Sequence, residues 1–162
     1  MIQKYTCKNG VRIVFEPIDT VRSVSIGVWV RVGSGNEHIK NNGISHFIEH
    51  MFFKGTKNRT AKEIAQAFDK IGGQVNAFTS KECTCYYAKV MDTYAQTALD
   101  ILADMFFCSQ FAPEEMAKEK NVVLEEIKMY EDSPEDYVHD LLAQTIFGDH
   151  PLGYWILGGE EN

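Results

Sequence analysis

The chain has 162 residues, 44% of them hydrophobic and 12% aromatic, which is enough for one sizeable core and predicts a single domain over residues 1–162. Its formal net charge of −7 argues against nucleic acid as a partner, because that partner requires a basic surface. No apolar run approaches the roughly 20 residues that cross a membrane, and the N-terminus shows no signal-peptide pattern, so we expect a cytoplasmic protein without a membrane partner.

The first part of the chain is predicted to form β structure. Residues 5–8 and 11–16 flank Asn9-Gly10, the strongest two-residue signal for a hairpin. Large apolar residues alternate along residues 24–32, which predicts a longer strand with one buried face. The glycine-rich residues 33–36 end that strand.

Helices dominate the chain after residue 43, with one further hairpin among them. The capping-box residues Thr60 and Glu63 open a helix that runs to about Ile71. Strands over residues 74–79 and 82–90, joined by a tight turn, form the second hairpin. Apolar residues at helical spacing predict further helices over residues 92–108, 113–130 and 137–147, and the tail 148–162 reads as a loop.

The four cysteines do not indicate a secreted protein. They are too few and too scattered for a disulfide framework. Cys83 and Cys85 lie two residues apart on a predicted strand and could bind a metal together. Small buried thiols are the preferred interpretation of this pair.

The motif H-x-x-E-H places His46 and His50 four residues apart, with Glu49 directly before the second histidine. On a helix both histidines project from one face, roughly 6 Å apart along the axis, so they can bind one tetrahedral zinc ion. Glu49 lies on the same side and can take a proton from a metal-bound water. Ser45, or Gly43 before it, is the candidate N-cap of this helix.

A histidine pair in a helix also arises by chance, so a third ligand decides between a zinc site and a hydrogen-bonded core. The helix predicted over residues 113–130 carries three candidates. Glu126 falls within about 20° of Glu119 beside the apolar stripe, whereas Glu125 points about 120° away. A metal can compensate a buried carboxylate, so we prefer Glu126 to Glu125 as the ligand. Glu119 would then orient a ligand, although without the histidine motif both would be ordinary surface positions.

Four segments in this order carry a resemblance to a known family: residues 43–55, residues 72–82 (GGQVNAFTSKE), residues 119–126 (EKNVVLEE) and residues 150–153 (HPLG). The chain resembles the insulinase/pitrilysin superfamily of inverted-motif zinc peptidases, most closely bacterial members similar to the mitochondrial processing peptidase. The resemblance runs through essentially the whole chain. It implies a two-layer α+β fold, an antiparallel-rich sheet with helices packed on one face.

The resemblance also implies the chemistry of the site. It makes His46, His50 and Glu126 the ligands of a zinc ion, Zn²⁺. Glu49 would be the general base, and Glu119 a second carboxylate that supports catalysis. The reaction would be hydrolysis of a peptide bond by a zinc-activated water.

A peptide is the partner that the resemblance implies. Asn76, Ala77 and Phe78 match the strand along which the substrate pairs with the sheet edge, and Phe78 would shape a side-chain pocket. Family members resemble two or more such domains closed around an unfolded peptide, so we expect a chain truncated at its C-terminal end. A second peptidase-like domain or a homo-oligomer would complete the chamber. The tail departs from the family at Tyr154-Trp155 and Gly159, where a proline and a hydroxyl residue are more usual.

Two functions therefore stay open. The first is a zinc metalloendopeptidase, or its catalytic half, that cuts short unstructured peptides. The alternative is a catalytically inactive scaffold or binding domain that lacks its partner half. The complete set of motif residues favours the peptidase, and an unrelated structural zinc domain would more often use cysteines.

Overall fold

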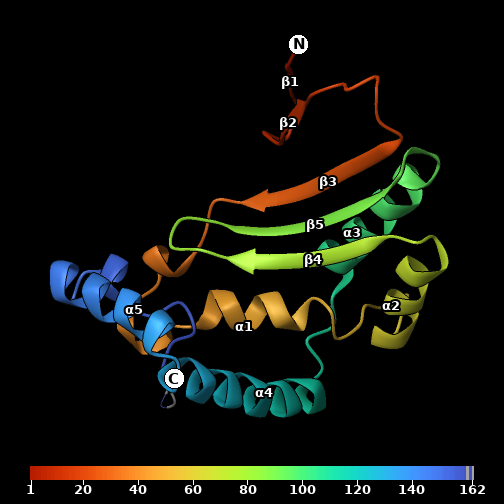
Figure 1. The fold of residues 1–162 in the computed structure, drawn as a ribbon. Coiled ribbons are helices and arrows are strands. Elements are labelled where there is room, and N and C mark those ends of the chain that lie inside the picture. The colour runs from red at the N-terminus through yellow and green to blue at the C-terminus, as the bar shows by residue number, and fades with distance from the viewer. Residues whose placement is uncertain (160, 162) are drawn as a thin grey trace.

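The computed structural model describes residues 1–159 and 161. The chain begins with a hairpin of β1 (Gln3–Thr6) and β2 (Arg12–Phe15), which stands apart from the main sheet (Figure 1). Gly10 has a φ of +88°, a conformation that glycine adopts at little cost. This is the hairpin that the Asn-Gly pair predicts.

The main sheet has three antiparallel strands in the order β3-β5-β4. The central strand is β5 (Thr84–Met91), and β3 (Ser23–Val30) and β4 (Gln74–Thr79) are its neighbours. The second predicted hairpin, β4 with β5, is therefore confirmed. Because β4 pairs only with β5 among the described residues, its other side is an open sheet edge.

Five α-helices accompany this sheet in the described part of the chain: α1 (Ile44–Met51), α2 (Ala61–Lys70), α3 (Ala95–Cys108), α4 (Pro113–Glu131) and α5 (Pro134–Phe147). Helix α1 lies alongside β4, and α4 runs on the side of α1 away from the sheet (Figure 1). The motif helix is thus enclosed between the sheet edge and the helix that carries the candidate third ligand.

The core lies between the sheet and the helices. On β5, Tyr86, Ala88 and Val90 are buried and point toward the helix layer, in contact with residues such as Phe68 and Leu102. The opposite face exposes Trp29 and Phe78, so among the described residues the helices cover one face only. The α+β fold class predicted from the sequence is confirmed, and apolar burial on this one face is its main source of stability.

Some boundaries differ from the prediction. The segment predicted as one helix over residues 92–108 begins with a 3-10 turn, Asp92–Tyr94, before α3. The strand predicted from residue 82 begins at Thr84, because Ser80 N–H donates to Cys83 O and closes a turn (2.8 Å). The predicted tail loop contains a 3-10 turn, Pro151–Gly153. Within the described residues, we find no helix with the length and apolarity required to cross a membrane.

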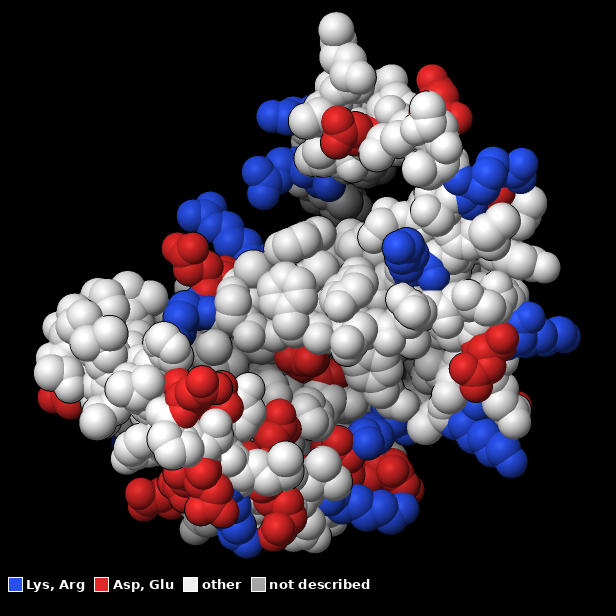
Figure 2. All heavy atoms as spheres, in the orientation of Figure 1, with Lys and Arg blue, Asp and Glu red and all other residues white. Residues whose placement is uncertain are grey.

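Charge is distributed unevenly over the surface. Figure 2 shows acidic side chains gathered over the lower part of the molecule, where α4 runs, with a few basic ones among them. The centre of this view, over the sheet, is largely uncharged. On this face, acidic side chains therefore gather near the helix that faces α1.

Candidate metal centre

A carboxylate from the preceding loop holds the N-terminus of α1. Glu37 is 6% exposed and accepts hydrogen bonds from the N–H groups of Gly43 (2.7 Å) and Ser45 (2.8 Å), and from the Asn42 amide (2.9 Å). The first turn of a helix has unpaired N–H groups and a positive dipole end, so a negative charge is favourable there. Of the two predicted candidates, Gly43 is the N-cap and Ser45 is not. Pattern analysis of the motif did not find Glu37.

The structure brings the three predicted ligands together. His46 and His50 project from one face of α1, and their ring centroids are 4.5 Å apart. Glu126 Oε2 of α4 lies 3.8 Å from His46 Nε2 and 3.5 Å from His50 Nε2. One ligand atom from each residue lies within 4.8 Å of the others. The pairing of α1 with α4 therefore builds a three-ligand cluster from segments far apart in the chain.

This cluster fits a zinc ion. Ligand atoms at about 2.0–2.1 Å from a tetrahedral ion are separated by roughly 3.3 Å, close to the distances between the histidine nitrogens and Glu126. Burial and the neighbouring His50 lower the pKa of His46 from 6.5 to about 4, which keeps its imidazole neutral and able to ligate. Two imidazoles and one carboxylate are a donor set typical of catalytic zinc, with a position left for water.

The two adjacent glutamates of α4 have different surroundings. The Glu125 side chain is 72% exposed and forms an ion pair with Lys128 (2.8 Å), one turn along the helix. The Glu126 side chain is 32% exposed and faces both histidines. The helical phase that separates Glu126 from Glu125 in the sequence therefore matches their positions in the structure.

Glu119 of α4 contacts the second histidine of the motif, His50. Its Oε1 is 2.8 Å from His50 Nδ1, and its Oε2 is 2.5 Å from Lys54 Nζ. Burial alone would raise the pKa of Glu119, but the hydrogen bonds from Lys54 and His50 hold it below its ordinary value. A carboxylate at Nδ1 leaves Nε2 of the same ring for a metal and fixes the ring's orientation. Lys54, at the end of the motif segment, was not singled out from the sequence.

Glu49 points from α1 toward the end of β4. Its Oε2 accepts a hydrogen bond of 2.5 Å from Thr79 Oγ1. Burial raises the pKa of Glu49, and the Thr79 hydrogen bond partly opposes that effect. A raised carboxylate pKa suits a group that must both accept and return a proton near neutral pH. Thr79, like Glu37 and Lys54, is a site residue that sequence analysis did not assign.

A cleft of about 420 Å³ opens beside these residues. Asn76, Glu49, His50 and Glu119 line it together with apolar side chains of the turn after α1, of α2 and of β4: Phe53, Ala61, Ile64, Ala65 and Val75. The other two residues predicted to bind the substrate lie elsewhere. Ala77 packs against the core, whereas Phe78 lies on the open sheet face, 40% exposed, with its ring 5.6 Å from that of Trp29.

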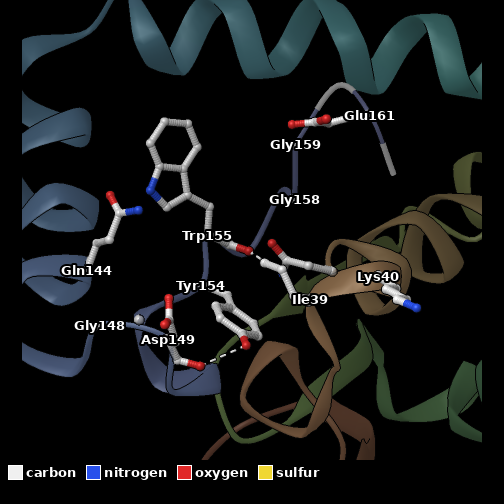
Figure 3. A pocket seen from close by; sticks show the side chains of 12 residues that line it. Ile39, Lys40, Gln144, Gly148, Asp149, Tyr154, Trp155, Gly158, Gly159 and Glu161 are labelled. Carbon is white, nitrogen blue, oxygen red and sulfur yellow. Dashed lines mark hydrogen bonds between the residues drawn. The ribbon is translucent and has the colours of Figure 1, made fainter.

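A second hollow, of about 480 Å³, lies away from the motif helix. Gln144, Asp149, Tyr154 and Trp155 line it together with Lys40 (Figure 3). None of the candidate zinc ligands or catalytic glutamates lines this hollow. Its wall is partly fixed by the Tyr154 hydroxyl, which donates to Asp149 O (2.8 Å; Figure 3).

Comparison with known proteins identifies the family. The insulinase family (peptidase family M16) matches residues 12–160, so the chain belongs to this family. The resemblance found in the four motifs is thereby confirmed.

Two similar relatives are bacterial. The chain is 67% identical over 161 residues to the uncharacterized zinc protease YmxG of Bacillus subtilis (strain 168), which covers 99% of this chain and 39% of that protein. It is 47% identical over 157 residues to an uncharacterized zinc protease of Streptomyces coelicolor, covering 97% of this chain and 34% of that protein. The chain thus spans little more than a third of the length of these relatives.

Solved structures share the fold. A crystal structure of a protease from Helicobacter pylori superposes with a TM-score of 0.94 at 29% identity and covers 99% of this chain and 39% of that one. An inactive M16 peptidase domain from Pseudomonas fluorescens gives a TM-score of 0.84 at 17% identity, covering 97% and 38% of the two chains. At 17% identity, the second match shows only that the fold is shared, since proteins with the same fold can be active or inactive.

Proposed function

We propose that this chain provides the catalytic half of a zinc metalloendopeptidase that hydrolyses short unstructured peptides. The observation that supports this most is the convergence of His46, His50 and Glu126, with Glu49 on the same helix. A structural zinc site would have no need of that nearby carboxylate or of an adjoining cleft. Membership of a family whose relatives are named zinc proteases supports the same proposal.

Each site residue has a distinct role in this proposal. His46, His50 and Glu126 would hold zinc, which would act as a Lewis acid and lower the pKa of a bound water. Glu49 accepts a proton from the attacking water and returns it to the leaving amine. Glu119 holds the His50 ring through Nδ1, and is itself held by Lys54.

The open edge of β4 is the proposed binding site of the peptide. A substrate strand could pair with the outward-facing backbone groups along Asn76, Ala77 and Phe78, as the family resemblance implies. Val75 and Asn76 of β4 line the same cleft as Glu49 and His50. We further propose a second peptidase-like domain, or a second copy of this chain, as the part that closes a chamber over this edge.

Zinc stoichiometry tests the metal site. We expect one zinc per chain in the parent protein and a loss or strong weakening of zinc binding in Glu126→Gln. Glu125→Gln is the matched control, because it removes the adjacent charge from an exposed position and should leave zinc affinity nearly unchanged. Equal losses in the two variants, or a parent chain that binds no zinc when supplied with it, would overturn the assignment.

Peptide cleavage tests the enzyme. Glu49→Gln should keep zinc and lower cleavage of an unstructured peptide by about 10²–10⁴-fold, the range that a general base contributes. Normal cleavage by this variant would remove Glu49 as the base. A zinc-loaded parent that binds peptides without cleaving them, even alongside its partner domain, would favour the inactive scaffold instead.

A further inference from the structure

The last residue of β4 reaches across to the motif helix. Side chains alternate along this strand, so Val75, Ala77 and Thr79 all point toward the helix layer. The first two pack against the core, whereas the Thr79 hydroxyl meets Glu49 Oε2 at 2.5 Å. The contact joins two elements that are separated by 30 residues in the chain.

The backbone around this hydroxyl is firmly held. Thr79 pairs with Thr84 at the end of the β4–β5 ladder. In the turn that follows, the oxygen of Ser80 accepts a hydrogen bond from Ser34 N–H (3.1 Å), and Lys81 O accepts one from Gly35 N–H (2.7 Å). The turn and the loop that follows β3 are packed backbone against backbone. The position of the Thr79 side chain is therefore set by the sheet and not by α1.

The Glu49 carboxylate has little else to orient it. Among the described residues, no other protein group donates a hydrogen bond to it. Its Oε1 is left without a protein donor and can face a water in the cleft that Glu49 lines. A flexible glutamate side chain loses effectiveness as a base if its carboxylate samples several orientations, because proton transfer requires the correct geometry.

We propose that Thr79 is a positioning residue for the general base. Its hydroxyl holds Oε2 of Glu49 and so presents the other oxygen toward the position of the attacking water. Thr79 is also the last residue of the strand proposed to pair with the peptide. Its hydrogen bond to Glu49 therefore connects the substrate-binding edge to the base. This inference rests on the proposed peptidase function.

The test compares Thr79→Val with Thr79→Ser in the full-length, zinc-loaded protein. Valine keeps the shape of threonine without the hydroxyl, so we expect kcat for an unstructured peptide to fall about 10- to 100-fold while KM and zinc stoichiometry stay near the parent values. Serine keeps the hydroxyl and should restore most of kcat. A crystal structure of Thr79→Val should show the Glu49 carboxylate rotated away from its parental position.

Thr84→Val is the matched control for loss of a hydroxyl at the end of this ladder. Its hydroxyl is buried and donates to Val32 O (2.9 Å) without contacting Glu49, so the variant should lose stability and keep the kcat of its folded fraction. An unchanged kcat in Thr79→Val, a failure of serine to rescue, or an effect on KM alone would overturn the inference. If the zinc-loaded parent did not cleave the peptide, the proposed function would fail; if the parent cleaved it and Thr79→Val cleaved it equally well, this inference alone would fail.

Discussion

Buried carboxylates near the site each have a different set of donors. Glu37 caps α1, Glu119 contacts His50 and Lys54, and Asp104 of α3 ties down the loop that follows α1. A buried charge is costly unless polar partners surround it, so each carboxylate fixes the groups that compensate it. In this way side chains outside the motif determine how rigidly the motif helix is held.

Asp104 gives a pH-dependent contribution to stability. It accepts hydrogen bonds from Thr56 (2.8 Å), Asn58 (2.6 Å) and Arg59 (2.5 Å). Burial alone would raise its pKa, but these donors hold the pKa of Asp104 below its ordinary value. Its stabilising effect is therefore present above the unfolded pKa of about 3.9, and is lost as the pH falls through the lower folded pKa.

Asp104→Asn should accordingly lower the free energy of unfolding by about 2–4 kcal/mol at neutral pH, because Arg59 loses its partner. At a pH below the lowered folded pKa of Asp104, the difference from the parent should shrink. Urea unfolding at both pH values measures it. Asp100→Asn, on the exposed side of the same helix, is the control and should have little effect at either pH. An Asp104→Asn deficit that is equal at both pH values would contradict the assignment.

At the scale of elements, the entry into α1 depends on close packing against the tail. Gly43 has a φ of +96°, and a Cβ built on it would lie 2.6 Å from Leu157 O. A Cβ built on Gly158 would likewise lie 2.4 Å from Asn42 O. The tail and the start of the helix therefore fit together only because both positions lack side chains. Packing against the tail thus helps to fix the start of α1, and with it the position of His46.

Gly43→Ala should therefore be more damaging than an ordinary glycine substitution. We expect a loss of more than about 2 kcal/mol in the free energy of unfolding and weaker zinc binding, because both φ strain and a backbone clash displace α1. Gly72→Ala is the control, with a φ of +61° and no atom within 4 Å of the added Cβ. It should show the strain alone, about 1 kcal/mol, and normal zinc binding. Equal effects of the two substitutions would argue against the clash.

At the scale of the whole molecule, the proposed zinc would join α1 to α4. These helices come from distant parts of the chain, and the histidines and Glu126 face each other across their contact. A ligand that binds only the folded state stabilises it by mass action. The site would therefore contribute to stability as well as to catalysis.

Removing zinc with a chelator should lower the melting temperature by roughly 10 °C if free zinc is about a thousandfold above its dissociation constant. Differential scanning calorimetry of the zinc-loaded and chelated protein measures the difference. Glu126→Gln, which lacks one ligand, should respond much less to the chelator. A parent protein that melts at the same temperature in both states would show that zinc does not link the two helices.

The sequence by itself determined the features that depend on local periodicity. The four-residue spacing of His46 and His50, the Asn9-Gly10 turn and the amphipathic phase that separates Glu126 from Glu125 are all set within one helix or hairpin. Such features follow from backbone geometry that is the same in every protein. For that reason most of the elements and the candidate ligands could be predicted from residue order, whereas the α+β fold class was implied by the resemblance to the family.

Only the tertiary structure decided which distant side chains support those residues. The contact of Thr79 with Glu49 spans 30 residues, and that of Asp104 with Thr56 spans 48. Lys54 and Glu37 likewise acquire their partners through packing. No periodicity encodes these contacts, because they depend on how the sheet, α1 and α4 pack together in three dimensions.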